Sequence, residues 1–369
     1  MNTFSTHAVD LMASSAAPCG LASEVAVSPY VVAQPGYAVV VEALEEKMLY
    51  NEVECADGVF RTIQTGDVMV GVLGERQALK GYSGRVPRNV RAGDVLNVLN
   101  LGGIIGDCTS ELPDLGPALR VKVLGAAMVP NADSANDPWV HARIQDGALK
   151  PVHSLEASAP LVMMSGTAMD TGKTLAACQI IKGLTDLGYR VAAAKLTGAS
   201  LMRDTRRMES HGAVATASFT DAGVICSTTA DTVPIAKGII AHLNRVAEPD
   251  VIVLELGAGF IGYYGVDEIL VDRQIHLQTA AHVVAASDLA GVWAAEQIFR
   301  DRYHTSIATI TGPVTDNDVG CSYVQNRIGI AAINAQQNPK PLAARVDRAL
   351  REAAARAALP DRTVAASGT

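Results

Sequence analysis

Residues 165–174 have the composition and spacing of a phosphate-binding loop. They read Ser-Gly-Thr-Ala-Met-Asp-Thr-Gly-Lys-Thr, which contains the pattern G-x-x-x-x-G-K-T. In such a loop the glycines let backbone N–H groups face phosphate oxygens, the lysine reaches the β- and γ-phosphates, and the threonine hydroxyl ligates Mg²⁺. We therefore predict that a polyphosphate binds here. The residues expected to contact it are Gly166, Thr167, Asp170, Thr171, Gly172, Lys173 and Thr174.

A strand and a helix must hold this loop in place. Residues 161–164 are a short apolar run typical of a buried strand, and residues 175–187 have the apolar spacing of a helix. The N-terminus of that helix would add a favourable dipole for an anion. A glycine-rich turn that binds nothing could have the same composition, but the strand-loop-helix context favours the phosphate-binding interpretation.

A second lysine is expected at the end of the next strand. Residues 190–195 have the composition of a strand, which ends in Lys195-Leu196-Thr197-Gly198. In open α/β sheets, ligands bind at the carboxyl ends of the strands. Lys195 is therefore a candidate catalytic residue, although an exposed lysine that only ends a strand would have the same pattern.

An acidic residue ends another apolar run. Residues 251–254 are Val-Ile-Val-Leu and Glu255 follows, which is a Walker B pattern with Glu in place of Asp. A carboxylate at this position would hold or orient a metal, so Glu255 is both a catalytic and a metal-binding candidate. Magnesium takes one or two carboxylates together with phosphate oxygens and water. Either Asp204 or Asp221 could complete the metal site, and either could instead cap a helix.

The turn after Glu255 also fits a dinucleotide-binding pattern. Gly257, Gly259 and Gly262 spell G-x-G-x-x-G, and Asp288 lies further along the chain. The pattern is weak on its own, and the sequence shows no clear long helix starting at Gly262. We favour a tight turn beside the phosphate-binding loop.

The order of elements predicts two domains. Strands and helices alternate over 159–358, which predicts an α/β fold like that of P-loop NTPases, with a mostly parallel sheet, helices on both faces and a last strand at 328–333. Short β-type runs separated by glycine, proline and aspartate predict a β-rich, barrel- or sandwich-like domain over 25–128. The remaining segments are predicted to be a flexible N-terminus (1–24), a linker (129–158) and a tail (359–369).

Glycine-rich, partly basic loops interrupt the β-rich region at 74–76, 80–85 and 101–106. We favour ordinary turns between strands, because glycine punctuates β-rich proteins generally. The alternative is that these loops form a wall of the substrate pocket, in which Arg76 or Arg85 pairs with an anionic group.

The composition is that of a globular protein. The chain has 369 residues, of which 49% are hydrophobic and 18% charged, and its net charge is −8. This balance lacks the basic footprint of nucleic-acid binding, and no apolar run reaches the roughly 18 residues that span a bilayer. The six cysteines are scattered without a C-x-x-C pair, which indicates reduced thiols. We expect a cytoplasmic location, a small-molecule substrate, no nucleic-acid or membrane partner, and a homo-oligomer, most simply a dimer.

These motifs together resemble dethiobiotin synthetase, an ATP-dependent ligase, over residues 161–259. The resemblance rests on the G-T-x-x-x-x-G-K-T loop, the strand-end Lys195 and the turn Glu255-Leu256-Gly257-Ala258-Gly259. It implies that Lys173 and Lys195 contact phosphates and that Thr174 and Glu255 serve the metal. Two positions depart from the family: Leu256 interrupts the acid-glycine turn, and Leu196 replaces a proline.

A wider stretch of the chain resembles an uncharacterised P-loop family. The segment Ser-Phe-Thr-Asp-Ala-Gly at 218–223 and the β-rich front domain carry this resemblance. Relatives of that family include a D-glutamate N-acetyltransferase.

These observations lead to an expected function with alternatives. We expect an ATP- and Mg²⁺-dependent enzyme, a ligase that activates a carboxyl or carbamate group of a small metabolite by phosphoryl transfer before an amine captures it. The alternative is a coenzyme-A-dependent N-acyltransferase of an amino acid, in which the loop holds the phosphates of coenzyme A. A nucleotide-gated regulatory protein is a third interpretation, but no feature of the sequence favours it.

Overall fold

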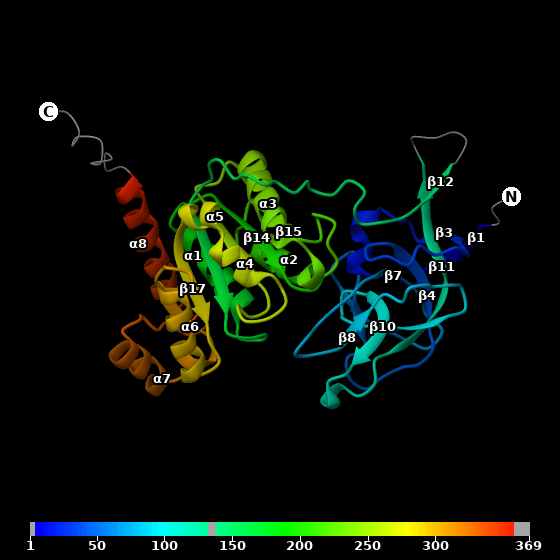
Figure 1. Ribbon diagram of the computed structural model, residues 1–369, viewed down its shortest axis with the longest axis horizontal. Helices are drawn as coiled ribbons and strands as arrows, with labels where there is room; N and C mark the ends of the chain where they lie inside the picture. The colour runs from blue at the N-terminus through cyan, green and yellow to red at the C-terminus, as the bar shows by residue number, and fades with distance from the viewer. Residues whose placement is uncertain (1–3, 132–137, 358–369) are drawn as a thin grey trace.

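The computed structural model describes residues 4–131 and 138–357, and most of its strands gather into two sheets (Figure 1). The blue and cyan N-terminal region is rich in strands, whereas the green to red C-terminal region alternates strands with helices. The predicted α/β fold with a β-rich N-terminal region is confirmed. Residues 1–3, 132–137 and the predicted tail at 359–369 lie outside the described residues.

Short strands dominate the N-terminal region. They are β1 (Ser5–Ala8), β2 (Leu11–Met12), β3 (Glu24–Ser28), β4 (Ala38–Ala43), β5 (Glu52–Glu54), β6 (Phe60–Thr62), β7 (Val68–Leu73), β8 (Ser83–Arg85), β9 (Val95–Val98), β10 (Ile104–Ser110), β11 (Arg120–Pro130) and β12 (Trp139–His141). Strand β11 pairs with β4, β4 with β7, and β7 with β10. Because β9 pairs with both β10 and β11, these five strands close into a barrel.

Strand β4 of the barrel is buried on both of its faces. Val39 and Val41 belong to one hydrophobic cluster, while Val40 belongs to another. All three are fully buried. Successive side chains of a strand point to opposite faces, so both faces of β4 are covered by protein.

Two N-terminal segments contain more structure than predicted. The segment expected to be a flexible N-terminus contains β1, β2 and a 3₁₀ helix at Ser14–Cys19; β1 pairs with β3, and β2 pairs with β7. The expected linker contains the end of β11 and the whole of β12, which pair with each other. The N-terminal segment and the first part of the predicted linker are therefore paired into the β-rich region, whereas residues 142–158 contain no helix or strand. Local composition does not reveal these strand partners.

The C-terminal region contains a six-stranded parallel sheet. Its strands are β13 (Leu161–Gly166), β14 (Val191–Thr197), β15 (Ala215–Ser218), β16 (Val251–Leu256), β17 (Thr279–Ala285) and β18 (Thr309–Thr311). Their order is β15-β14-β16-β13-β17-β18, and every neighbouring pair is parallel. Strands β13, β14 and β16 are buried along their whole length. That is expected of a parallel sheet covered on both faces.

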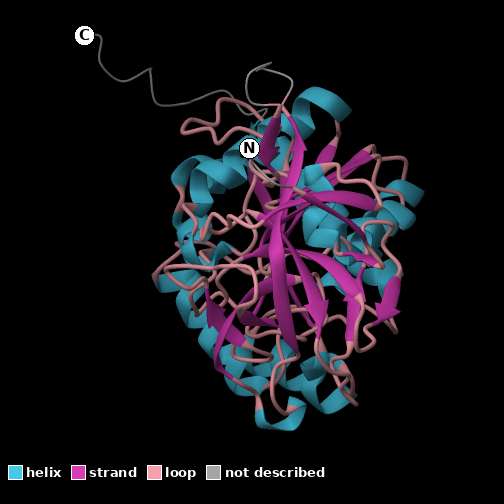
Figure 2. Ribbon diagram, turned by 90° about the vertical axis from the view of Figure 1, so that its right-hand side faces the viewer, coloured by secondary structure: helices cyan, strands magenta, loops and turns pink. Residues whose placement is uncertain are grey.

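Helices cover both faces of this sheet (Figure 2). They are α1 (Lys173–Asp186), α2 (Arg203–Ser210), α3 (Thr232–Ala247), α4 (Val266–Val271), α5 (Arg273–Gln278), α6 (Leu289–Asp301), α7 (Asp318–Tyr323) and α8 (Pro339–Ala357), with a π-helical turn at Val324–Ile328. Apolar residues of α1, α2 and α8 share one cluster with the sheet, and those of α3 to α6 share the other. In the described residues, no helix has both the length and the apolar character needed to cross a membrane.

The last predicted strand, at 328–333, is wrong. After the π-helical turn the chain makes only one bridge, between Ala332 and Ile310 of β18. The apolar residues of this segment resemble a buried strand, but β18 has three residues and offers little length for pairing. Apolar residues of this segment such as Ala332 are buried, but the segment does not form a strand.

Candidate functional site

The phosphate-binding loop joins β13 to α1 and is tightly curled. Gly172 precedes α1 in the left-handed conformation, with φ of 82°. A Cβ atom on Gly166 would lie 2.7 Å from Thr171 Oγ1 and 2.9 Å from the Lys173 side chain, so only glycine fits there. Residues 169–175 line a cavity of about 370 Å³. The loop therefore has the hollow that the sequence predicts.

The predicted loop residues divide into two groups. Gly172, Lys173 and Thr174 line the cavity together with Asp170 and Thr171, whereas Gly166 and Thr167 do not. The Thr167 hydroxyl instead accepts a hydrogen bond from the backbone N–H of Ser287 at 3.3 Å, beyond the end of β17. The Asp170 carboxylate forms an exposed ion pair with Lys80 of the N-terminal region at 3.5 Å. Exposed pairs of this kind contribute little to stability.

Lys173 lies across the loop and is almost completely buried. Its Nζ donates to the carbonyl oxygen of Ala168 at 2.6 Å and to Thr171 Oγ1 at 3.4 Å. Burial, with a smaller contribution from the nearby Lys195, lowers the pKa of Lys173 to about 8, while Glu255 opposes the change. A phosphate that enters the loop would compete with the Ala168 carbonyl for this ammonium.

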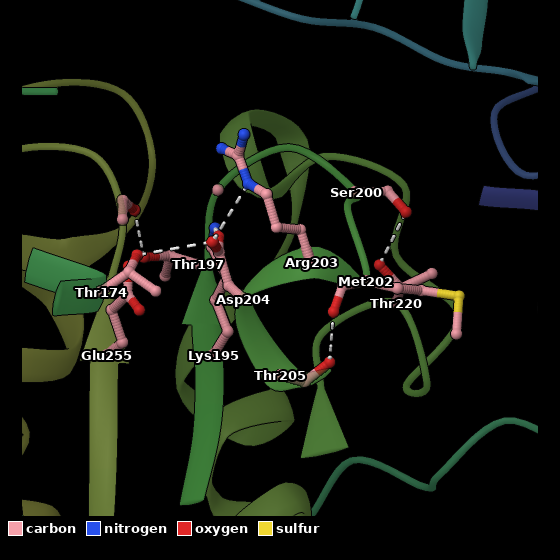
Figure 3. A network of polar contacts seen from close by, with 12 residues as sticks. Thr174, Lys195, Thr197, Ser200, Met202, Arg203, Asp204, Thr205, Thr220 and Glu255 are labelled. Atoms are coloured by element: carbon pink, nitrogen blue, oxygen red, sulfur yellow. Dashed lines mark hydrogen bonds and ion pairs between the residues drawn. The ribbon is translucent and has the colours of Figure 1, made fainter. Parts of the chain in front are cut away.

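The ends of β14 and β16 bring a lysine and a carboxylate together. Lys195 and Glu255 are in register as neighbours in the sheet, and both are buried. Helix α2 adds Asp204, whose carboxylate forms an ion pair with Lys195 Nζ. Figure 3 shows Asp204 and Glu255 beside Thr174 at the start of α1, with Lys195 next to Asp204. Thr174 Oγ1 lies 2.9 Å from Glu255 Oε1 and 3.5 Å from Asp204 Oδ1.

The two carboxylates differ in their electrostatic environment. Burial opposes ionisation of Asp204, but the charges of Lys195 and Arg203 outweigh it and lower the pKa of this group. Burial raises the pKa of Glu255, although Lys195 acts against the rise. Glu255 Oε2 is buried and has no hydrogen-bond partner among the described residues. A buried carboxylate oxygen without a partner is costly, so a ligand is expected to supply one.

Thr174, Glu255 and Asp204 could hold a magnesium ion. Their oxygens are the hard ligands that Mg²⁺ prefers, and the unpartnered Glu255 Oε2 fits a cation. Within residues 4–131 and 138–357, no group of three or more His, Cys, Asp or Glu side chains is placed to hold a metal. Phosphate oxygens and water would have to complete the coordination, as is usual for Mg²⁺.

Asp221 is not brought to this site. Its carboxylate accepts hydrogen bonds from the backbone N–H of Ser218 at 2.7 Å and from the Ser218 hydroxyl at 3.0 Å. It lines a different cavity, together with residues 216–218 and Thr220. Of the two aspartates that the sequence left open, Asp204 is the one at the phosphate-binding loop.

The glycine turn after β16 packs against the loop. The backbone N–H of Phe260 donates to the Gly166 carbonyl at 3.0 Å, and a Cβ atom on Gly259 would lie 2.8 Å from the Thr167 carbonyl oxygen. The next helix, α4, starts only at Val266 and has six residues. The turn is thus a close neighbour of the loop, as we favoured over a dinucleotide-binding segment.

The N-terminal region also contributes to the cavity. Tyr50, Arg76 and Asn100 line it in addition to the loop residues, as does Tyr264 from the turn after β16. For the glycine-rich loops we favoured ordinary turns, but the structure places Arg76 in the cavity wall, whereas Arg85 is not among the lining residues. Tyr50, Asn100 and Tyr264 were not predicted, because nothing local in the sequence indicates that the barrel meets the loop.

Comparisons with known proteins find solved structures with a similar fold, but no family model or curated protein that matches the sequence. The structure is similar to the signal recognition particle receptor FtsY from Elizabethkingia anophelis, with 12% identity over 58% of this chain and 76% of that chain and a TM-score of 0.37. It is also similar to HypB from Helicobacter pylori, in complex with nickel, with 14% identity over 54% and 88% of the two chains and a TM-score of 0.34.

A third similar structure is a DUF1611 family protein from Anabaena variabilis. Its identity is 12% over 62% of this chain and 70% of that chain, with a TM-score of 0.38. Because these TM-scores are below 0.5, the fold assignment rests on the strand order and loop geometry of this chain. On those grounds the chain is a P-loop α/β protein with a β-rich N-terminal region.

Proposed function

We propose that this protein is a Mg²⁺- and ATP-dependent ligase that activates a carboxyl or carbamate group of a small metabolite by phosphoryl transfer. The observation that carries this proposal is the convergence of Thr174, Glu255 and Asp204 at the phosphate-binding loop, with Lys173 and Lys195 beside them. A lysine pair next to hard oxygen ligands is suited to a polyphosphate and its metal. In phosphoryl transfer, catalysis is mostly positioning and neutralisation of charge.

Each residue has a distinct role in this proposal. Lys173 leaves the Ala168 carbonyl and binds the β- and γ-phosphates, where its positive charge is compensated. Lys195, held by Asp204, faces the charge that develops on the transferred group. Thr174, Glu255 and Asp204 would hold the magnesium ion, which would supply positive charge to neutralise the phosphates.

The resemblance of residues 161–259 to dethiobiotin synthetase supports ligase chemistry over simple hydrolysis. That family couples a loop of this kind to a lysine after the next strand, and here Lys195 occupies the corresponding position. Leu256 and Leu196, which depart from the family, are fully buried. Both pack in a hydrophobic cluster, and neither is among the residues that line the cavity.

The test measures nucleotide binding and product formation in the full-length protein. We expect Mg²⁺–ATP to raise the melting temperature more than GTP or acetyl-CoA does, since a ligand that binds only the native state stabilises it. ADP should form only when an acid or amine substrate is present. Free thiol released from acetyl-CoA, without ADP, would instead support the N-acyltransferase.

The matched variants are Lys173→Ala and Lys182→Ala. Both lysines lie on α1, but Lys182 is exposed and pairs with Asp186 at 3.2 Å on the surface. Loss of Lys173 should reduce ADP formation by about a hundredfold or more, as removal of one charge-stabilising group does in other enzymes. Lys182→Ala should keep full activity. A fully active Lys173→Ala variant would overturn the proposal.

A further inference from the structure

Arg76 is a buried cation on the wall of the cavity that faces the phosphate-binding loop. It follows β7 in the N-terminal region, and only 4% of the residue is exposed. One Nη donates to the carbonyl oxygen of Leu99, and the other donates to the carbonyl oxygen of Lys80 at 3.2 Å. Among the residues that the structure describes, no carboxylate lies within 4.0 Å of this guanidinium.

Two buried polar atoms of the Arg76 cluster have no hydrogen-bond partner within the described residues. Its Nε is buried and makes no hydrogen bond within the described residues, and the same is true of the Tyr264 hydroxyl. The hydroxyls of Tyr50 and Tyr264 interact electrostatically with the guanidinium. Buried charges are normally paired with an opposite charge, because removing an ion from water is unfavourable. A bound anion would supply the opposite charge that this cluster lacks among the described residues.

The backbone at Gly81 lies close against the guanidinium of Arg76. Gly81 has a φ of 105°, and a Cβ atom there would lie 3.0 Å from both Nη atoms of Arg76. Carbonyl oxygens fix two of the guanidinium nitrogens, so the orientation of its planar donor group is set in advance. Planar, fixed donors of this kind match the geometry of a carboxylate.

We propose that Arg76, with the hydroxyls of Tyr50 and Tyr264, binds a carboxylate group of the small-molecule substrate. The substrate then lies between the barrel and the phosphate-binding loop, with its carboxylate on Arg76 and its reacting group toward Lys173 and Lys195. This inference rests on the proposed function for the position of the nucleotide, and it adds the substrate class: an anionic metabolite that carries at least one carboxylate besides the group that reacts.

A purely structural role for Arg76 makes a different prediction. If Arg76 served only to hold the backbone at Lys80 and Leu99, its loss would lower stability without changing the response to carboxylates. The Tyr264 hydroxyl would then serve only to accompany the guanidinium, with which it interacts. Binding of a carboxylate is therefore the readout that separates the two roles.

The test uses the full-length protein with Mg²⁺ and a non-hydrolysable ATP analogue. Acetate, succinate, glutarate and citrate are the probes, with glutaramide as the neutral counterpart of glutarate. Melting temperature and isothermal titration calorimetry report binding. We expect at least one of the carboxylates to bind the wild type, and glutaramide not to bind.

The variants are Arg76→Gln, Tyr264→Phe and the control Arg85→Gln. Arg85 lies in the same region of the chain, but its side chain is 69% exposed and lies 3.8 Å from Asp107 in a surface ion pair. Arg76→Gln should weaken carboxylate binding by about tenfold or more, and Tyr264→Phe should weaken it less, as expected for loss of a charged and a neutral donor. Arg85→Gln should bind like the wild type.

The outcomes separate this inference from the proposed function. A wild type that binds the nucleotide but no carboxylate, or an Arg76→Gln variant that binds carboxylates as well as the wild type, overturns the inference. A wild type that binds a carboxylate but no nucleotide overturns the proposed function instead. If Arg76→Gln does not fold, Tyr264→Phe decides, because it removes one hydroxyl only; unchanged carboxylate affinity in that variant counts against the inference.

Discussion

The positive charge of Lys173 has no carboxylate in contact with it among the residues that the structure describes. Within the described part of the chain its ammonium donates to the neutral oxygens of Ala168 and Thr171, and burial is the main cause of its pKa of about 8. A bound polyphosphate would favour the charged form, so binding raises this pKa. Above pH 8 the free protein has largely lost the proton and must take it up again on binding. Nucleotide affinity should therefore fall as the pH rises above 8, by no more than roughly tenfold per pH unit.

Calorimetry at pH 8.5 in two buffers of different ionisation enthalpy measures this proton uptake directly. Arginine stays charged at this pH, so Lys173→Arg is the control in which the uptake should disappear. An affinity for nucleotide that is equal at pH 7 and pH 9, with no proton uptake, would contradict the role given to Lys173.

At the scale of elements, helix α2 is held from the N-terminal region of the chain. Glu54 on β5 is fully buried, and its Oε2 accepts from the Ser14 hydroxyl at 2.6 Å and from the backbone N–H of Met202 at 2.7 Å. Met202 immediately precedes α2, and an acidic group at a helix N-terminus interacts favourably with the helix dipole. Because α2 carries Asp204, the position of that carboxylate depends on Glu54.

Glu54→Ala should lower the free energy of unfolding by about 1–3 kcal/mol, since it leaves a hydroxyl and a backbone N–H without their acceptor. It should also lower turnover, because Asp204 and its ion pair with Lys195 lose their support. The control is Glu52→Ala, on the same strand but exposed. Urea unfolding and ADP formation measure the two effects. Turnover that stays normal in folded Glu54→Ala would show that α2 is positioned without this contact.

Sequence patterns predict the strands and the loop of the C-terminal sheet better than they predict where helix α2 and the N-terminal barrel lie against it. The loop at 166–174, the strand ends at Lys195 and Glu255, and the parallel sheet follow from local composition, because carboxyl ends of parallel strands share one edge. The choice between Asp204 and Asp221 needed the tertiary structure, since it depends on where α2 lies against the sheet. So did the choice between Arg76 and Arg85, because closure of the barrel through β9 brings distant segments together.

At the scale of the whole molecule, the barrel and the sheet meet where the cavity lies. Asn100 Nδ2 donates to the carbonyl oxygen of Ser200 at 2.9 Å, and the Arg206 side chain donates to the backbone at Ala56 and Asp57. These contacts attach the barrel to α2 and to the segment that leads into it. The cavity is therefore complete only while the barrel and the sheet keep this arrangement.

Gly102 tests that dependence, because a Cβ atom there would lie 2.0 Å from the carbonyl oxygen of Ser200. Gly102→Ala should push the barrel away from residues 200–202, so carboxylate binding and turnover should fall by roughly tenfold to a hundredfold, as small misplacements do. Mg²⁺–ATP should still raise the melting temperature.

In the control, Gly93→Ala, the added Cβ meets nothing, but the φ of 96° is strained for alanine. That variant should lose about 1–2 kcal/mol of stability and keep its activity. If folded Gly102→Ala binds carboxylates and turns over normally, the barrel does not position the substrate.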